Sequence, residues 1–582
     1  MRVEEKQLKL FLEDSSLVKK DTIKRAEVKA KKTGKKFEEV LLNEGLISRE
    51  DLIRLKAYIL GIPFINLEKE IIPKEVLEII PEPIARRHNI VAFRKKGKDL
   101  EVAMLDPEDL QTIEFIKKKS NLRILPRLTT PESIKNALLQ YRKTLGAEFA
   151  ELIKKEAKGI KVEEIKDKEK EREELEKIAQ EIPIIKIADS LLKHAVLDRA
   201  SDIHIEPMEN EVLVRYRIDG ILRHAMTLPK QAAPGIVARI KVLANLKLDE
   251  HRLPQDGRFK FENNGDKYSV RVSVLPVLNG EKVVMRLLAE EARGYNLEEL
   301  GLRGKALEDA QTALRRPTGM ILVTGPTGSG KTTTLYSMIE ILNTPEVNIS
   351  TIEDPIEYRM PRVNQTQVKP EIGLTFANGL RALLRQDPNI IMVGEIRDNE
   401  TASLAVNAAL TGHLVLSTLH TNNAAGAIPR LIDMKIEPFL IASTLNLILS
   451  QRLVRRLCEA KKEYHLSSSQ IKQISKYCNI KRVEDILKKE GLLEKKGSIK
   501  DVTFFDPKST KTCPDGYKGR IGIFEVLPVT ESIKKLIIQN ATSGQIQQRA
   551  QKEGVITMIE DGFVKAARGI TTIEEVLRVI ME

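Results

Sequence analysis

The sequence predicts an α/β protein whose largest domain is a parallel sheet carrying one nucleotide-binding loop. The apolar run from Met320 to Thr324 is typical of a buried parallel strand. It leads directly into GPTGSGKT, a full match to G-x-x-x-x-G-K-[ST], and then into a helix expected to end near Leu342. After residue 300, strands and helices alternate, which is the order that a parallel sheet requires.

The residue types of this loop are those that bind phosphate groups. Glycines take positive φ, so successive N–H groups turn inward around phosphate oxygens, and the following helix adds its positive end. Lys331 should reach the β- and γ-phosphates, and the Thr332 hydroxyl should ligate Mg²⁺. The expected nucleotide contacts are Gly325, Pro326, Thr327, Gly328, Ser329, Gly330, Lys331, Thr332 and Thr333.

Length and composition exclude several classes of protein. A chain of 582 residues indicates three or four domains, and its net charge of +13 is mixed with acid along most of the sequence. Three cysteines argue against a disulfide framework and for a reducing cytosol. The charged N-terminus is no signal peptide, and without an apolar run of about 18 residues nothing should span a membrane.

The first 182 residues divide into three parts. Residues 1–60 contain a weak helical repeat, for which two ordinary amphipathic helical hairpins in a small bundle are the favoured interpretation. Residues 61–145 predict a small α+β domain with strands starting near Ile90, Leu100 and Arg123. Highly charged residues 146–182 read as a linker.

Two further domains complete the prediction. Residues 183–299 indicate an α/β domain that begins with a helix at Pro183 and contains strands near Val212 and Tyr268. Residues 300–582 form the nucleotide-binding domain, with a less regular segment at 456–520 and helices at the end.

Polar residues follow three strands of the predicted parallel sheet, at the edge where such sheets bind ligands. Glu353-Asp354, Glu395 and His420 occupy these positions. A P-loop needs a neighbouring carboxylate to hold Mg²⁺ and a group that orients the attacking water. Glu353-Asp354 and Glu395 both qualify.

The motifs GPTGSGKT, TIEDPIEY, RQDPNIIMVGEIRD and TGHLVLSTLHTN together resemble those of the secretion-superfamily ATPases, in particular the pilus-assembly and type II secretion motors. The resemblance is close over 183–582 and looser over 1–145. It implies a RecA-like P-loop ATPase domain preceded by a PAS-like α/β domain. It also implies that Glu353 activates water, that Glu395 holds Mg²⁺ in an atypical Walker B motif, and that His413 and His420 sense the γ-phosphate of ATP.

Arginines complete the implied site. In the resembling family, arginines of the preceding domain reach the nucleotide of the adjacent subunit, and Arg271 and Arg286 are the first candidates, with Arg217 and Arg258 behind them. Arginines on strands are also commonly solvated. Two further arginines, Arg381 and Arg385, serve the same site or pair with carboxylates.

The chain departs from the family in two places. Two Cys-x-x-Cys pairs that bind Zn²⁺ are reduced to Cys458 and Cys513, and Cys478 and His465 would have to complete a zinc site, so we expect no zinc and a subdomain held by packing. The helical repeat resembles a cyclic di-GMP domain, but its openings read Gln7-Leu8-Lys9 and Lys36-Phe37-Glu38 instead of Arg-Leu-Gly, and its terminal positions are Ala30 and Ile59. We expect the fold to persist without the ligand.

The resemblance implies a homo-hexameric, cytoplasmic ATPase at the inner face of a bacterial inner membrane, acting on a membrane platform protein. Type IV pilus assembly is the favoured machine and type II secretion the alternative. A nucleic-acid translocase would need a basic stripe with aromatic stacking partners, which the sequence lacks. A non-hydrolysing scaffold would not need Glu353 and Glu395.

Overall fold

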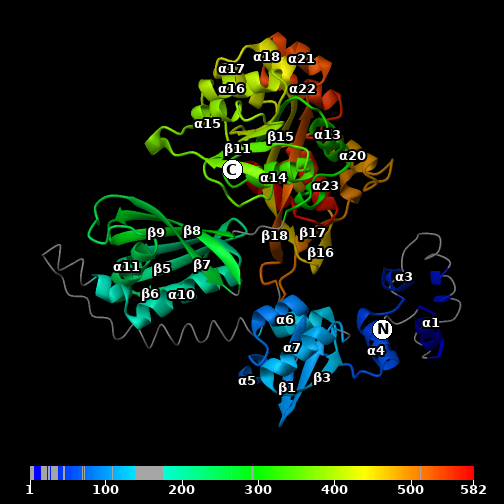
Figure 1. Ribbon diagram of the computed structural model, residues 1–582. Coiled ribbons are helices and arrows are strands. Elements are labelled where there is room, and N and C mark those ends of the chain that lie inside the picture. Colours follow the sequence, from blue (N-terminus) through cyan, green and yellow to red (C-terminus); the bar gives the residue numbers. More distant parts are fainter. Residues whose placement is uncertain are drawn as a thin grey trace. The chain divides into compact units, whose positions relative to one another are not determined.

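The computed structural model describes most of the chain (Figure 1). The described residues are 5–14, 22–23, 26–27, 37–43, 46–68, 70, 72–107, 109–138, 140, 175–263, 265–289, 294–510 and 513–581. The chain divides into two compact units, residues 1–164 with 180–191 and residues 165–179 with 192–582. The two parts expected as separate domains, 183–299 and 300–582, thus fall almost wholly in the second unit. Most of the expected linker, residues 146–174, lies outside the described residues.

The first unit begins with helices and continues as a small α/β region. Its elements are α1 (Glu5–Asp14), α3 (Phe37–Asn43), α4 (Arg49–Leu60), α5 (Lys74–Leu77), α6 (Glu82–His88), β1 (Ile90–Lys96), β2 (Asp99–Met104), α7 (Leu110–Ser120) and β3 (Arg123–Leu128). Leu8 and Leu41, from the two copies of the repeat, are fully buried in one core. The repeat positions Ala30 and Lys36 lie outside the described residues. The three expected strands are present, in the order β1-β2-β3.

An antiparallel six-stranded sheet opens the second unit. Helix α10 (Ile182–Leu197), which is divided between the two units, precedes this sheet. The other elements are β4 (Ala200–Pro207), β5 (Glu211–Ile218), β6 (Ile221–Pro229), η2 (Lys230–Ala232), α11 (Ala233–Leu243), β7 (Gln255–Asn263), β8 (Asp266–Val277) and β9 (Gly280–Ala289). The strand order is β6-β5-β4-β9-β8-β7. Side chains alternate along each strand, so one face buries apolar residues such as Ile203 and Met285 while the other carries charged residues such as Asp202 and Arg286.

The nucleotide-binding domain is a seven-stranded sheet covered by helices on both faces. Its strands are β10 (Gly319–Thr324), β11 (Ile349–Glu353), β12 (Val363–Gln367), β13 (Ile390–Val393), β14 (Leu414–Leu419), β15 (Leu445–Leu457) and β18 (Tyr517–Pro528), in the order β12-β11-β13-β14-β10-β15-β18. All neighbours are parallel except β15 and β18.

The alternation of buried residues explains the two helical layers. The helices are α12 (Leu297–Leu300), α13 (Gly304–Leu314), α14 (Lys331–Leu342), η3 (Pro370–Ile372), α15 (Phe376–Leu383), α16 (Asn399–Leu410), α17 (Ala427–Asp433) and α18 (Pro438–Thr444). Met320 and Leu322 of β10 pack into the core with α15 to α18, whereas Ile321 and Val323 pack into the core with α13 and α14. The predicted α/β fold class is confirmed, and the carboxyl ends of the parallel strands share one edge.

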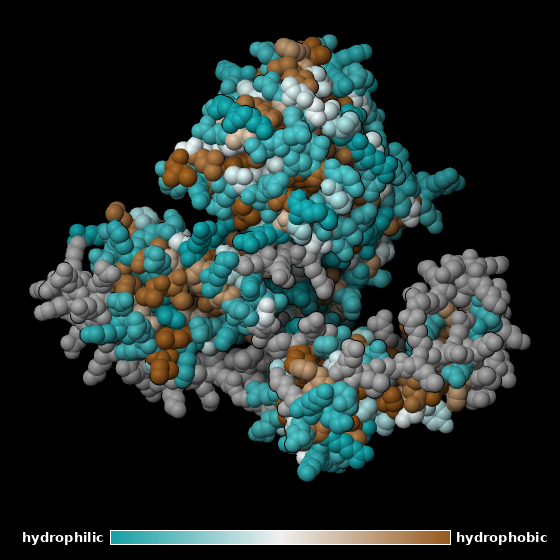
Figure 2. All heavy atoms as spheres, in the orientation of Figure 1, coloured by the Kyte–Doolittle hydropathy of each residue, from teal (hydrophilic) through white to brown (hydrophobic). Residues whose placement is uncertain are grey.

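The end of the chain adds a second small core. Helices α21 (Glu531–Ile538) and α22 (Ser543–Lys552) pack into the core with α15 to α18. The small core is built from β16 (Lys461–Tyr464), α19 (Ser468–Ile474), α20 (Ile480–Lys489), η4 (Ile499–Asp501), β17 (Phe504–Pro507), α23 (Met558–Ala567) and α24 (Ile573–Met581). Leu487, Phe504 and Phe563 are fully buried there. Hydrophilic side chains cover most of the coloured surface in Figure 2. None of the helices within the described residues has the length and apolar character that crossing a bilayer requires.

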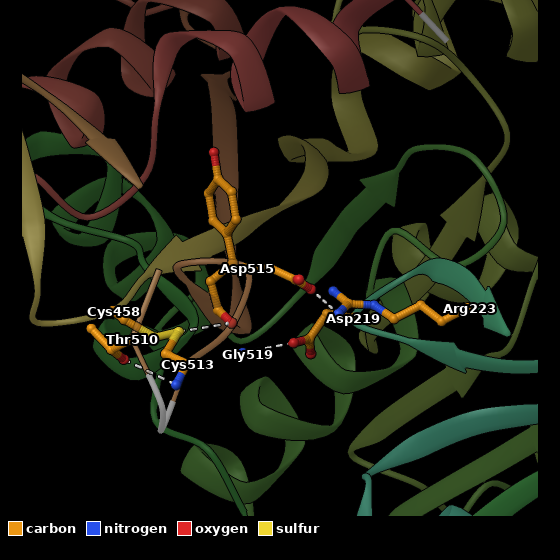
Figure 3. The surroundings of a disulfide bond; sticks show 8 residues. Asp219, Arg223, Cys458, Thr510, Cys513, Asp515 and Gly519 are labelled. Carbon is orange, nitrogen blue, oxygen red and sulfur yellow. Dashed lines mark hydrogen bonds and ion pairs between the residues drawn. A yellow bond between two sulfur atoms is a disulfide. The ribbon is translucent and has the colours of Figure 1, made fainter. Parts of the chain in front are cut away.

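A disulfide joins Cys458, just after β15, to Cys513, just before β18 (Figure 3). Because these two strands are antiparallel neighbours, with Leu457 opposite Tyr517, the bond closes the base of the segment inserted between them. The expectation of reduced cysteines and of a subdomain held by packing alone was therefore wrong. In the described residues no group of three or more His, Cys, Asp or Glu side chains could hold a metal ion.

The disulfide gives a first prediction. Reducing it, or replacing both cysteines by serine, should lower the melting temperature, because the crosslink spans 55 residues and such bonds contribute about 2–4 kcal/mol. Cys478→Ser is the matched control, since that thiol is unpaired and its pKa is raised by burial to about 11. Thiol titration of unreduced, denatured protein should find one thiol per chain, and finding three would contradict the crosslink.

Candidate active site

The loop after β10 has the backbone that phosphate binding requires. Gly325 and Gly330 have φ values of 144° and 91°, a region that side chains rarely adopt. A Cβ on Gly325 would also lie 2.5 Å from the carbonyl oxygen of Gln451. Helix α14 starts at Lys331, as predicted, so its N-terminal N–H groups open onto the loop. The loop is therefore built to surround an anion.

Lys331 lies inside this loop. Its Nζ donates to the carbonyl oxygens of Gly325, at 2.9 Å, and Pro326, at 3.0 Å. Burial lowers the pKa of the Lys331 ammonium, and the Glu395 carboxylate opposes that shift. A partly desolvated cation interacts more strongly with an anion than one in open water does.

Gln451 was missed by the sequence analysis. This residue of β15 is almost fully buried; its Nε2 donates to the Ser329 carbonyl oxygen at 2.7 Å, and its Oε1 accepts from the Thr334 hydroxyl at 2.7 Å. It thereby ties the loop and the start of α14 to the neighbouring strand. The available signal was a lone amide side chain after the apolar run LNLILS.

Glu353 ends β11 and is only 2% exposed. Its carboxylate accepts hydrogen bonds from the hydroxyl of Tyr336 on α14, from the Thr351 hydroxyl at 2.6 Å and from Gln365 Nε2 at 3.2 Å. Burial raises the pKa of Glu353, and the three donors oppose that rise. The sequence predicted Glu353, but neither Tyr336 nor Gln365, because these donors come from other elements.

Glu395 follows β13 and lies beside two cationic or titratable groups. Its carboxylate forms an ion pair with Arg397, and its Oε2 lies 3.5 Å from Nε2 of His420. Burial lowers the pKa of His420, and nearby Lys331 lowers it further. His420 follows strand β14 and Glu395 follows strand β13. Because these strands are parallel neighbours, the two predicted residues lie close together.

His413 does not belong to this group, which corrects the prediction that both histidines sense the γ-phosphate. His413 precedes β14 and His420 follows it, so the two histidines lie at opposite ends of this strand. The ends of a six-residue strand are about 20 Å apart. His413 Nδ1 instead lies 3.0 Å from the carbonyl oxygen of Ala408. Its place is structural.

Most of the predicted residues line a cleft of about 900 Å³ within the second unit, but Gly325, His413 and Arg271 do not. Its lining includes the loop from Pro326 to Thr333, Glu353, Glu395 and His420, together with Arg217 and Arg286 of the six-stranded sheet. Arg286 therefore lines the cleft that contains the loop of its own chain, and its reach to the nucleotide of a neighbouring subunit stays a prediction.

The remaining arginines are paired with acids or exposed. Arg271 Nη2 lies 3.5 Å from the Glu357 carboxylate of the same chain. Burial lowers the pKa of Arg271, and the charge of Arg286 adds to that effect. Of the two α15-region arginines, Arg381 pairs with Glu400 at 2.7 Å, and Arg385 donates to the Arg381 carbonyl oxygen at 3.0 Å. For Arg381 the structure thus supports the carboxylate-pairing alternative.

The loop, the buried glutamate and the acid beside a histidine define a P-loop ATPase. The chain belongs to the family described as Type II/IV secretion system protein, whose model matches residues 177–578. A second model, the MshEN domain, matches residues 60–148. The expected ATP hydrolase class is confirmed.

Individual relatives cover nearly the whole chain. The type IV pilus assembly ATPase PilB of Myxococcus xanthus is 39% identical over 97% of this chain and 96% of its own. PilB of Pseudomonas aeruginosa is 37% identical over 98% and 97%. The type II secretion system protein E of Xanthomonas campestris is 40% identical over 92% and 91%. The chain is thus similar to proteins of type IV pilus assembly and of type II secretion at nearly equal identity.

Proposed function

We propose that this protein is a ring-forming ATPase that converts ATP hydrolysis into mechanical work for type IV pilus assembly. The observation that carries the proposal is the cleft lined by the phosphate-binding loop, Glu353, Glu395 and His420, in a chain that matches a pilus assembly ATPase over 97% of its length. We infer a homo-hexamer at the inner face of a bacterial inner membrane, with a membrane platform protein as the partner. Type II secretion is the second candidate, favoured by the equal similarity to protein E.

The residues divide the work of hydrolysis. Inward N–H groups of the loop and the Lys331 ammonium bind the β- and γ-phosphates of ATP. Glu353 holds the attacking water in line and accepts its proton, a role that suits a carboxylate whose pKa is raised by burial. His420, which is beside Glu395, contacts the γ-phosphate, and Arg286 supplies positive charge as negative charge moves toward the leaving oxygen.

The donors in the cleft fit Mg²⁺. The Thr332 hydroxyl and the Glu395 carboxylate are hard oxygen ligands, and Mg²⁺ in such sites keeps several waters and binds substrate phosphates besides one or two protein groups. When bound, Mg²⁺ would neutralise phosphate charge.

The MshEN model matches residues 60–148, after the helical repeat, and for the repeat itself we propose no cyclic di-GMP as a ligand. Lys9, at a position where the resembling repeat has glycine, forms an ion pair with Glu27 at 3.0 Å and lies over the Phe37 ring. The Lys9 side chain thus contacts other residues of the helical region.

The proposed function has a direct test. In the source organism, deletion of the gene should remove surface pili seen by electron microscopy, and a Lys331→Ala copy should fail to restore them. Lost export of secreted proteins with normal pili would favour the type II alternative. Purified protein should hydrolyse ATP without DNA and give a hexamer by native mass spectrometry, while hydrolysis that requires DNA would contradict the proposal.

A further inference from the structure

One transverse row of the six-stranded sheet contains four arginines and a single acid. Arg258 lies opposite Arg271, Arg271 opposite Arg286, Arg286 opposite Asp202, and Asp202 opposite Arg217. Residues directly opposite one another point to the same face of a sheet. Like charges in such positions repel, so the row accumulates positive charge that an anion would relieve.

Asp202 is the acid in this row, and its side chain is only 6% exposed. Its Oδ1 accepts from Nε of Arg286 at 2.9 Å, and its Oδ2 lies 3.4 Å from Nε of Arg217. The Ser201 hydroxyl donates to Oδ2 at 2.8 Å, which holds the carboxylate itself in place. One buried carboxylate thus separates and anchors two arginines.

Asp202 binds the Nε atom of Arg286 and leaves its two terminal amino groups unbound. Arg286 is bonded through Nε, and its side chain is 55% exposed. A guanidinium has five N–H donors, so its two terminal amino groups are available to a phosphate. Arg217, by contrast, donates a hydrogen bond from its terminal Nη1 to the carbonyl oxygen of Gly220 at 3.1 Å. Asp202, Arg217 and Arg286 all line the cleft that contains the phosphate-binding loop.

We propose that Asp202 is a positioning residue for ATP hydrolysis: it fixes the Arg286 guanidinium so that its terminal amino groups face the phosphates. The inference rests on the proposed function, because it assigns a role within the same reaction. A flexible arginine loses more conformational entropy when it binds the transition state than an arginine already held by a buried partner does. Asp202 therefore acts on kcat through Arg286 and does not touch the nucleotide.

The same strand offers a matched control. Glu206 lies on the same face of β4, is 7% exposed, and binds Arg215 through two hydrogen bonds of 2.8 Å and Lys282 at 2.9 Å. Neither Glu206 nor Arg215 lines the cleft. Glu206→Gln thus removes a buried acid with two cationic partners, as Asp202→Asn does, without touching the arginine row.

The test compares steady-state kinetics of the full-length assembled protein. Asp202→Asn should lower kcat by on the order of 10²-fold with little change in KM for ATP, since a misplacement of about 1 Å costs that much. Glu206→Gln should leave kcat unchanged while lowering the melting temperature. In a double-mutant cycle, adding Asp202→Asn to Arg286→Ala should change kcat less than about twofold, because the arginine that it positions is absent.

A second variant covers the case in which Asp202→Asn fails to fold. Arg286→Lys keeps the positive charge on an exposed side chain but loses the Nε donor, and it should reduce kcat nearly as much as Arg286→Ala. Equal loss in Asp202→Asn and Glu206→Gln, additive losses in the cycle, or wild-type kcat in Arg286→Lys would each overturn the role of Asp202. These ratios compare variants with the active wild-type protein, whereas a wild-type protein that does not hydrolyse ATP would contradict the proposed function itself.

Discussion

Glu353→Gln should abolish ATP turnover and leave ATP bound. The amide keeps the shape of the carboxylate but cannot accept a proton from water, and general-base catalysis typically contributes about 10² to 10⁴ in rate. Tyr336, Thr351 and Gln365 all donate to the carboxylate, so the variant loses charge where three donors converge. Phosphate release and equilibrium nucleotide binding, measured on the same sample, separate the two effects.

Glu525→Gln is the matched control for this prediction. Glu525 is also a buried glutamate at a strand of the same sheet; it accepts from the Ala424 N–H at 2.9 Å, and burial raises its pKa too. It does not line the cleft around the loop. Turnover of Glu353→Gln similar to that of the control would remove Glu353 from the reaction.

The raised pKa of Glu353 adds a pH dependence. A carboxyl whose pKa lies above its ordinary value takes up a proton at a higher pH, so hydrolysis should fall on acidification earlier than an ordinary glutamate would allow. The limb of kcat against pH reports this group in the enzyme–substrate complex. A flat profile down to the ordinary glutamate range would contradict the assignment.

Lys331→Ala should weaken ATP binding by on the order of 10² to 10³-fold, since truncating one partner of a buried charge pair costs about 2–5 kcal/mol. Nζ lies inside the loop, bonded to the carbonyl oxygens of Gly325 and Pro326, so the ammonium is held beside the backbone that surrounds the phosphates. Titration calorimetry with a slowly hydrolysed ATP analogue measures the change.

Lys305→Ala provides the comparison for that loss. Lys305 is on α13, bonds to the carbonyl oxygen of Glu553 at 3.1 Å, and lies outside the lining of the cleft. Its replacement removes one positive charge without removing a phosphate contact. Similar affinity losses in both variants would show that net charge, and not the loop, governs binding.

The local parts of the site could be predicted because they depend on neighbours in sequence. Gly325 to Thr332 defines its own turn and the helix that follows, and α14 spans the predicted residues. The apolar runs before Glu353 and Glu395 are strands, so both acids are placed at a strand end by their own segments. In parallel strands those ends meet at one edge, which made the pair of acids predictable without coordinates.

The tertiary structure decided what depends on distant pairing. Strand register placed Asp202 between Arg286 and Arg217, and it placed His413 at the far edge of the sheet. The antiparallel pairing of β15 and β18 brought Cys458 to Cys513, which composition alone had suggested would stay reduced. The sequence by itself determined the phosphate loop and the acids at strand ends, because φ preferences and short apolar runs act locally. Strand pairing decided which arginines reach the cleft, which donors surround Glu353 and which cysteines join. Each of these contacts needs two distant segments, and the sequence between them does not indicate how the segments align.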